Sequence, residues 1–221
     1  MRNALLLLAA PLLDGSGPLP YPDLLARIEQ DRSLFQQCWL ASDTACRREL
    51  ILRARSYLLT TIGTELFDRW YGTSWAFYGT TRTPGEGAIA CGYFVTTILD
   101  DAAYTLPRVK WAQLAAGEMI LKMVPTVKRF RDKSVENVEA WLATQGDGLF
   151  AVGLDNHVGF ILRSNGVAHF VHSSFYGPGD GVMNEPLDGN NPFAFSRYRV
   201  IGKLLDDAMV KRWIEGEALG R

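Results

Sequence analysis

The pattern of hydrophobic and polar positions divides the chain into a helical first part and a second part with strands. Leu24, Leu25 and Ile28 fall on one face of a helix, and residues 47–59 repeat apolar side chains at helical spacing, so we expect helices across residues 22–67. Further helices are predicted at residues 91–103, 108–122, 134–143 and 204–216.

The period changes to that of strands after residue 148. Residues 149–163 and 167–175 are strand-like runs joined across Asn165-Gly166, and Asn-Gly is a strong signal for a two-residue hairpin turn. A Gly/Pro-rich loop is expected at residues 176–191 and a third strand at residues 195–201. Helices followed by strands predict an α+β fold, with helices packed on one face of an antiparallel sheet.

The N-terminus combines one positively charged side chain with an apolar run from Ala4 to Leu13. Such a run is typical of a secretory signal peptide and is shorter than the roughly 20 residues that span a bilayer, so we expect export and no transmembrane span. The alternative is a buried first helix or strand of a cytosolic protein. We divide the chain into a signal peptide at residues 1–16, a helical region at residues 17–70 and a C-terminal domain at residues 71–221.

Composition and charge narrow the class of protein. The 221 residues are 48% hydrophobic and 11% aromatic, which is typical of a globular protein with a substantial core. The 23 Lys and Arg balance 24 Asp and Glu to a net charge of −1, so no overall positive field favours nucleic acid, and we predict no nucleic-acid partner. The oligomeric state stays open.

Cysteine and histidine are scarce, with three of each. Cys38 and Cys46 flank a turn-like break between two helical patterns, so they are either a disulfide between neighbouring helix ends or two small apolar residues. All three histidines lie between positions 157 and 172.

Cys91 follows a Gly/Pro-rich loop and begins a predicted helix. The partial positive charge of a helix N-terminus favours a thiolate, and its N–H groups, that of Gly92 among them, can hold an oxyanion. Taken alone, Cys91 is better explained as a buried core residue than as a nucleophile. His157 and His172 lie on the two strands of the predicted hairpin and should be neighbours, which provides a base and a group that orients it. Strand alternation places His169 on the opposite face.

These residues resemble the NlpC-type papain-like cysteine peptidases and amidases that cut peptide bonds in bacterial peptidoglycan. An aromatic and glycine segment, WAFYGTT, precedes Cys91; His157-Val158-Gly159-Phe160-Ile161 is similar to the family's H-V-G-I-Y strand; and Val171-His172-Ser173 is similar to its next strand, V/I-H-A. The resemblance covers Trp75 to Ser174. The chain departs from the family's D-C-S-G at Ala90-Cys91-Gly92-Tyr93.

The resemblance implies a papain-like catalytic domain at residues 71–221, without a cofactor or metal. It implies Cys91 as nucleophile, His157 as general base and acid, and His172 as the residue that orients His157. The family's tyrosine near the nucleophile falls on Trp75, or on Tyr78 if the loop is longer, and these two join Gly92 as candidates for contact with substrate or oxyanion. The implied substrate is peptidoglycan or a peptide, and the implied compartment is the periplasm or the outside of the cell.

Three other interpretations remain. A papain-like fold also serves transglutaminases, deamidases and acyltransferases that act on proteins. A zinc site could use Cys91, His157 and His172, although the sequence has no CxxC or HExxH motif. A non-catalytic module that binds the cell envelope could retain the motif only as part of its fold. We also expect the helical stretch at residues 108–143, which is longer than the compact family core requires, to form part of a substrate groove.

Overall fold

The computed structural model describes residues 17–175 and 181–220. The predicted signal peptide at residues 1–16 lies outside this range. Within it, no helix has the length and apolar character needed to cross a membrane.

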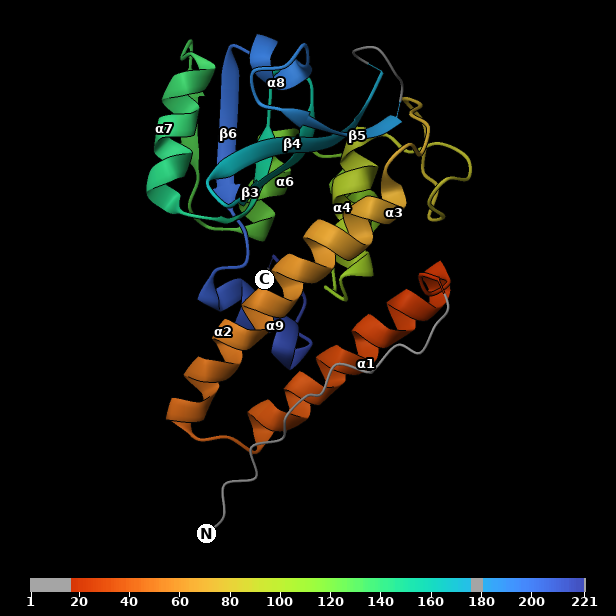
Figure 1. Ribbon diagram of the computed structural model, residues 1–221, viewed down its shortest axis with the longest axis vertical. Helices are drawn as coiled ribbons and strands as arrows, with labels where there is room; N and C mark the ends of the chain where they lie inside the picture. The colour runs from red at the N-terminus through yellow and green to blue at the C-terminus, as the bar shows by residue number, and fades with distance from the viewer. Residues whose placement is uncertain (1–16, 176–180, 221) are drawn as a thin grey trace.

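The fold is built on one sheet of six antiparallel strands in the order β1-β6-β2-β3-β4-β5, which confirms the α+β class. The strands are β1 (Lys128–Arg131), β2 (Gly148–Gly153), β3 (Val158–Ser164), β4 (Val167–Ser174), β5 (Gly181–Pro186) and β6 (Tyr198–Lys203). Figure 1 shows the sheet at one end of the molecule and a long pair of helices at the other.

The helices fall before, between and after the strands. They are α1 (Tyr21–Leu40), α2 (Thr44–Thr60), the π-helical segment η1 (Thr61–Leu66), α3 (Phe67–Trp70), α4 (Cys91–Asp101), α5 (Arg108–Ala112), α6 (Ala116–Met123), α7 (Val135–Gln145), α8 (Pro192–Phe195) and α9 (Asp207–Glu215). The single helix predicted at residues 108–122 is wrong: it is broken into α5 and α6 around residues 113–115.

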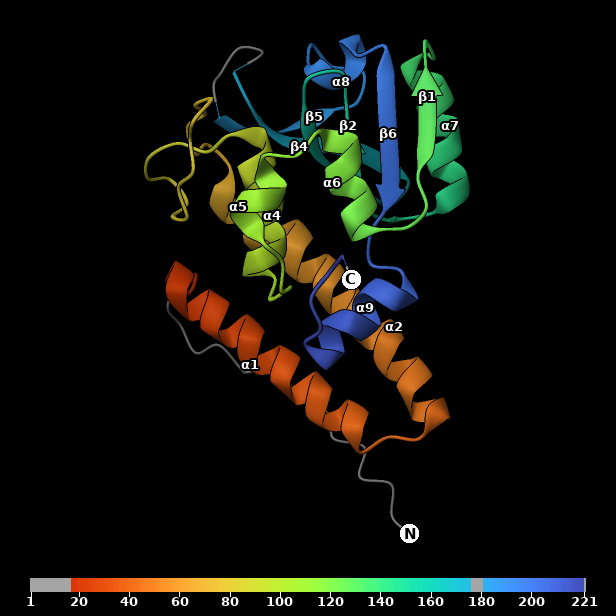
Figure 2. The ribbon, with the colours of Figure 1, turned by 180° about the vertical axis from the view of Figure 1, so that it is seen from behind.

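Helices cover both faces of the sheet, so the prediction of one covered face is also wrong. Val138 and Leu142 of α7 pack on one face, whereas α4 and α6 pack on the other; Figure 2 shows α6 in front of the sheet and α7 beyond β1. The reason lies in β2, whose six residues are all buried and therefore need apolar cover on both sides.

The strand segments also differ from the prediction in number. Residues 149–163 were expected to form one strand, but the chain turns after β2, and the N–H of Leu154 donates to the carbonyl of His157 at 2.8 Å. The hairpin at Asn165-Gly166 is confirmed, and both residues have the positive φ that its turn requires. The expected loop at residues 176–191 instead contains β5, which pairs with β4.

The helical region at residues 17–70 shares a core with the end of the chain. Phe35 of α1 and Tyr57 of α2 pack their rings against Trp213 of α9, with centroids 5.5 and 5.8 Å away. Phe67 of α3 in turn packs against Phe160 of β3 at 5.4 Å. This continuous core fixes the long helices against the sheet and against α4.

Candidate active site

Cys91 is the first residue of α4, as predicted, and is partly buried against the main core. Ala90 precedes it in an extended conformation, and the N–H of Phe94 closes the first turn on the carbonyl of Ala90 at 2.8 Å. Gly92 permits close packing here, because a β-carbon at this position would lie 2.3 Å from the carbonyl oxygen of Ala112. The end of α5 is therefore held directly against the start of α4.

The electrostatics of the thiol differ from the expectation based on the helix N-terminus. Burial raises the pKa of Cys91 above its ordinary value, although hydrogen bonds from the N–H groups of Val158, Gly92 and Cys91 itself act in the opposite direction. Desolvation of the thiolate thus outweighs these three hydrogen bonds, which favours a neutral thiol at rest. The contact with Val158 also places the sulfur beside the residue that follows His157.

His157 and His172 form the contact that the hairpin predicted. His157 lies in the turn that enters β3, His172 lies in β4, and the distance from Nε2 of His157 to Nδ1 of His172 is 2.9 Å. Their rings are perpendicular, with centroids 5.0 Å apart.

The third member of this chain of hydrogen bonds was not predicted from the sequence. Nε2 of His172 lies 2.7 Å from Oε2 of Glu185, on the edge strand β5. Glu185 pairs with Phe170 and so projects from the same face as His172. A short Val-Met-Asn-Glu run between glycines and prolines offers a weak strand signal, and only its pairing with β4 identifies it.

The carboxylate determines which ring nitrogens carry protons. A carboxylate only accepts hydrogen bonds, so Nε2 of His172 donates to Glu185 and Nδ1 of the neutral ring accepts from Nε2 of His157. In a neutral His157 the remaining nitrogen, Nδ1, is then unprotonated. The geometry leaves a basic nitrogen on His157 for a proton from another group.

Both imidazoles are neutral near pH 7. Burial, with a smaller contribution from His172, lowers the pKa of His157 to about 3. Burial also lowers the pKa of His172, although its hydrogen bond to Glu185 and the charge of that carboxylate oppose the shift. A neutral thiol and a neutral imidazole are the resting forms of Cys91 and His157.

Packing on the same face fixes the ring of His172. The ring of Phe170 stacks on it, with centroids 4.0 Å apart and an interplanar angle of 15°. A β-carbon on Gly159 would lie 2.8 Å from Cβ of His172 and 2.7 Å from Cε2 of Phe170, so this strand position accommodates only glycine without movement.

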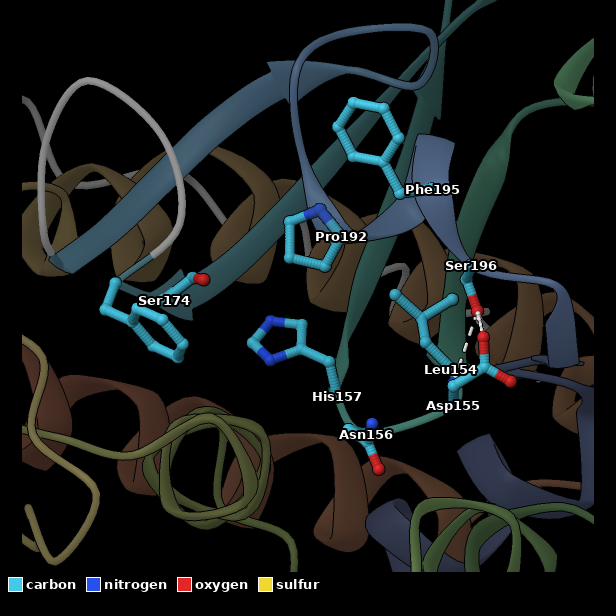
Figure 3. A pocket seen from close by; sticks show the side chains of 9 residues that line it. Leu154, Asp155, Asn156, His157, Ser174, Pro192, Phe195 and Ser196 are labelled. Carbon is cyan, nitrogen blue, oxygen red and sulfur yellow. Dashed lines mark hydrogen bonds between the residues drawn. The ribbon is translucent and has the colours of Figure 1, made fainter.

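Two cavities meet at the turn formed by residues 154–157. The thiol cavity, of about 420 Å³, is lined by Cys91 and His157 together with residues 112, 114–117 and 119 and with Tyr198 and Val200 of β6. The aromatic cavity, of about 240 Å³, is lined by His157, Phe175 and Phe195 and does not include Cys91. Figure 3 shows the ring of His157 within the lining of the aromatic cavity, near Ser174 and Pro192. Within the stretch at residues 108–143, it is residues 112, 114–117 and 119 that line the thiol cavity.

The structure does not bring Trp75 and Tyr78 to the thiol. Neither lines the thiol cavity; Trp75 packs on Phe175 with centroids 4.7 Å apart, and Tyr78 is 87% exposed. Backbone bridges from Ser74 to Ala88 and from Thr80 to Ile89 close this segment into a loop. Contact of Trp75 or Tyr78 with substrate or oxyanion therefore stays a prediction.

The remaining cysteines and histidine have no part in this geometry. Cys38 and Cys46 are free thiols, so the disulfide is not formed. His169 pairs with Leu162 and, three residues from His172, lies on the opposite face of β4.

The geometry also argues against a zinc site. Both ring nitrogens of His172 are engaged in hydrogen bonds, so it could not ligate a metal without breaking one. Across the two described segments of the chain, no three His, Cys, Asp or Glu side chains are grouped so as to hold a metal ion.

The comparisons with known proteins give no match: no family model, no curated protein and no solved structure is significantly similar to the chain.

Proposed function

We propose that this protein is a cysteine hydrolase with a papain-like arrangement, which cleaves an amide bond by nucleophilic attack of Cys91. The observation that carries the proposal is the chain of hydrogen bonds from His157 through His172 to Glu185, at 2.9 and 2.7 Å, in a cavity that His157 shares with the thiol. A buried relay that ends in a carboxylate is a recurring way to orient a catalytic imidazole.

The reaction would proceed in two halves. Nδ1 of His157 takes the thiol proton as Sγ of Cys91 bonds to the carbonyl carbon, and the resulting imidazolium protonates the leaving nitrogen as the C–N bond breaks. Water then gives a proton to His157 and adds its hydroxide to the thioester, and the thiol recovers its proton as the S–C bond breaks. The N–H groups of Cys91, Gly92 and Val158, which contact the sulfur, are candidates for holding the oxyanion.

The two other residues of the relay act through His157. His172 fixes its tautomer and ring orientation, and Glu185 fixes the tautomer of His172 and offsets the positive charge that develops when His157 is protonated. Nδ1 of the neutral His157 is unprotonated at pH 7, but its pKa of about 3 makes it a weak base at rest, so it would accept the thiol proton only as Sγ attacks the carbonyl.

The proposed substrate is a peptide of bacterial peptidoglycan. We also propose that this protein is exported, which would bring it to that substrate. Support comes from the H-V-G and V-H strand motifs at His157 and His172, which are similar to those of cell-wall hydrolases. The same site chemistry also serves transglutaminases, deamidases and acyltransferases, and the product distinguishes them from a hydrolase.

The test is digestion of purified peptidoglycan, with released fragments identified by mass spectrometry. We expect new amine and carboxylate ends from the wild type and about 10³-fold or greater loss with Cys91→Ala or His157→Ala. Cys46→Ala is the matched control, because Cys46 is an exposed free thiol on α2 and lies outside the cavity. Full release by Cys91→Ala would overturn the proposal, and binding without release would indicate a non-catalytic module.

A further inference from the structure

The wall of the thiol cavity is aliphatic on the side formed by α5, α6 and β6. Leu114, Met119 and Val200 contribute aliphatic side chains, Tyr198 contributes one aromatic ring, and Gly117 and the alanines at positions 112, 115 and 116 contribute the rest. Among the described residues that line the cavity, Asp155 is the one acidic side chain and none is Lys or Arg.

The carboxylate of Asp155 already has partners in the protein. Its Oδ2 accepts hydrogen bonds from Oγ of Ser196 and from the N–H of Arg197, each at 2.8 Å. These bonds lower the pKa of Asp155, so it stays ionised at neutral pH. The cavity therefore carries a negative charge at the turn and has no lining cation to match an acidic ligand.

Two arginines close to Tyr198, a residue that lines this wall, already have partners in the protein. The guanidinium of Arg197 donates to Asp132 at 2.8 Å, and that of Arg131 lies 5.6 Å from the ring centre of Tyr198. A carboxylate entering the cavity would lose its hydration without gaining a partner, which is unfavourable. An aliphatic group would gain by leaving water.

The position of His157 indicates which cavity would hold the acyl side of the scissile bond and which would hold the leaving-group side. His157 lines both, whereas Cys91 lines only the thiol cavity. Because His157 would protonate the leaving nitrogen, the leaving group belongs on the side of His157 that faces the aromatic cavity. The acyl group, which becomes bonded to Cys91, is left with the aliphatic wall.

We propose that the thiol cavity selects an uncharged aliphatic acyl group and discriminates against one that carries a carboxylate. This inference rests on the proposed function, because it takes Cys91 as the nucleophile. In a peptide substrate it predicts an alanine or leucine residue, rather than an acidic one, on the acyl side of the bond.

The test uses chloromethyl ketones, which place a chosen acyl group beside a thiol. Sγ of Cys91 bonds to the methylene carbon, chloride leaves, and the thiol proton passes through His157 to solvent. We would compare reagents built on N-acetylleucine and on N-acetylglutamate, with the rate at each cysteine followed by peptide mass spectrometry. The exposed Cys46 of the same molecule serves as the internal reference.

We expect the leucine reagent to modify Cys91 at least about 10-fold faster than the glutamate reagent, after normalisation to Cys46. Leu114→Lys supplies a cation in the wall and should reduce or invert this ratio. Leu121→Lys is its matched control, because Leu121 is on α6, is 45% exposed and does not line the cavity. Circular dichroism verifies that both variants are folded.

The outcomes separate this inference from the proposed function. Equal or faster modification of Cys91 by the glutamate reagent, or no modification by either, would overturn the aliphatic acyl site. A second outcome is a preference for the leucine reagent together with an unchanged rate of Cys91 modification in His157→Ala. That result would support the aliphatic acyl site and overturn the assignment of His157 as the catalytic base. A third reagent, 1-chloroheptan-2-one, tests whether the natural acyl group is a fatty acyl chain or an amino acid. Modification of Cys91 that is faster than with the leucine reagent indicates a fatty acyl chain, and slower modification indicates an amino acid.

Discussion

Glu185 accepts a hydrogen bond from Nε2 of His172 at 2.7 Å, and this bond determines the tautomers of two imidazoles in succession. The side chain of His172 is fully buried, and that of Glu185 is 16% exposed, so the pair is largely shielded from competing water. The relay therefore depends on a carboxylate at the edge of the sheet.

The first prediction concerns Glu185→Gln. An amide can donate as well as accept, so it no longer fixes the proton on His172, and it lacks the charge that stabilises protonated His157. We expect kcat to fall by about 10- to 1,000-fold with a much smaller change in KM. Glu49→Gln on the exposed surface of α2 should leave both constants unchanged. Equal constants for Glu185→Gln and the wild type would show that the relay ends at His172.

The second prediction concerns Gly159→Ala. The added methyl group would meet Cβ of His172 and the ring of Phe170 below 3.0 Å. We expect a loss of about 1–3 kcal/mol in the free energy of unfolding, measured in urea, and a drop in kcat as His172 is displaced from His157. Gly17→Ala is the control, since its methyl group meets nothing within 4 Å. Unchanged kcat in Gly159→Ala would show that the position of His172 is not critical.

The third prediction concerns the pH dependence of the thiol. Because burial raises the pKa of Cys91, little thiolate is present at pH 7 and its fraction increases with pH. The rate of alkylation by iodoacetamide at Cys91, measured by peptide mass spectrometry, should therefore keep rising between pH 6 and pH 9. A rate that is already constant above about pH 6 would indicate a resting thiolate–imidazolium pair instead.

The fourth prediction concerns stability in acid. The pKa of His157 is about 3 in the folded protein, against an ordinary value of 6.5, so unfolding takes up a proton between these values. The free energy of unfolding should decrease as the pH falls below 6.5, by up to about 1.4 kcal/mol per pH unit for this group. His157→Gln removes the titrating group, and urea unfolding from pH 7.5 to pH 4.5 should show a smaller slope. Parallel curves for the two proteins would contradict the burial of a neutral imidazole.

The parts of the site that the sequence predicted are those set by local signals. Asn165-Gly166 specifies a two-residue turn, and that turn brings His157 and His172 together. The Gly/Pro-rich loop before Cys91 marks the start of a helix. Each signal acts over a few residues and needs no knowledge of tertiary packing.

The parts that were missed depend on contacts between distant residues. β2 and the first half of β3 are buried on both faces, on either side of the turn at residues 154–157. Their sequences therefore show no alternation of apolar and polar residues, and nothing in the pattern marks where one strand ends and the next begins. β5 carries Glu185 but has few β-branched residues, and its pairing with β4 defines it. The burial that raises the pKa of Cys91 is set by the fold as a whole, so the position of the thiol at a helix N-terminus does not predict it.

The order of the elements along the chain has a consequence for synthesis. Cys91 lies in α4, whereas His157, His172 and Glu185 lie in or next to three consecutive strands that come later. A nascent chain therefore presents the thiol before the groups that would activate it have left the ribosome. Under the proposed mechanism, an incomplete chain that ends before β5 would lack the carboxylate that orients His172, and full reactivity would be acquired only when the last strand of the relay pairs.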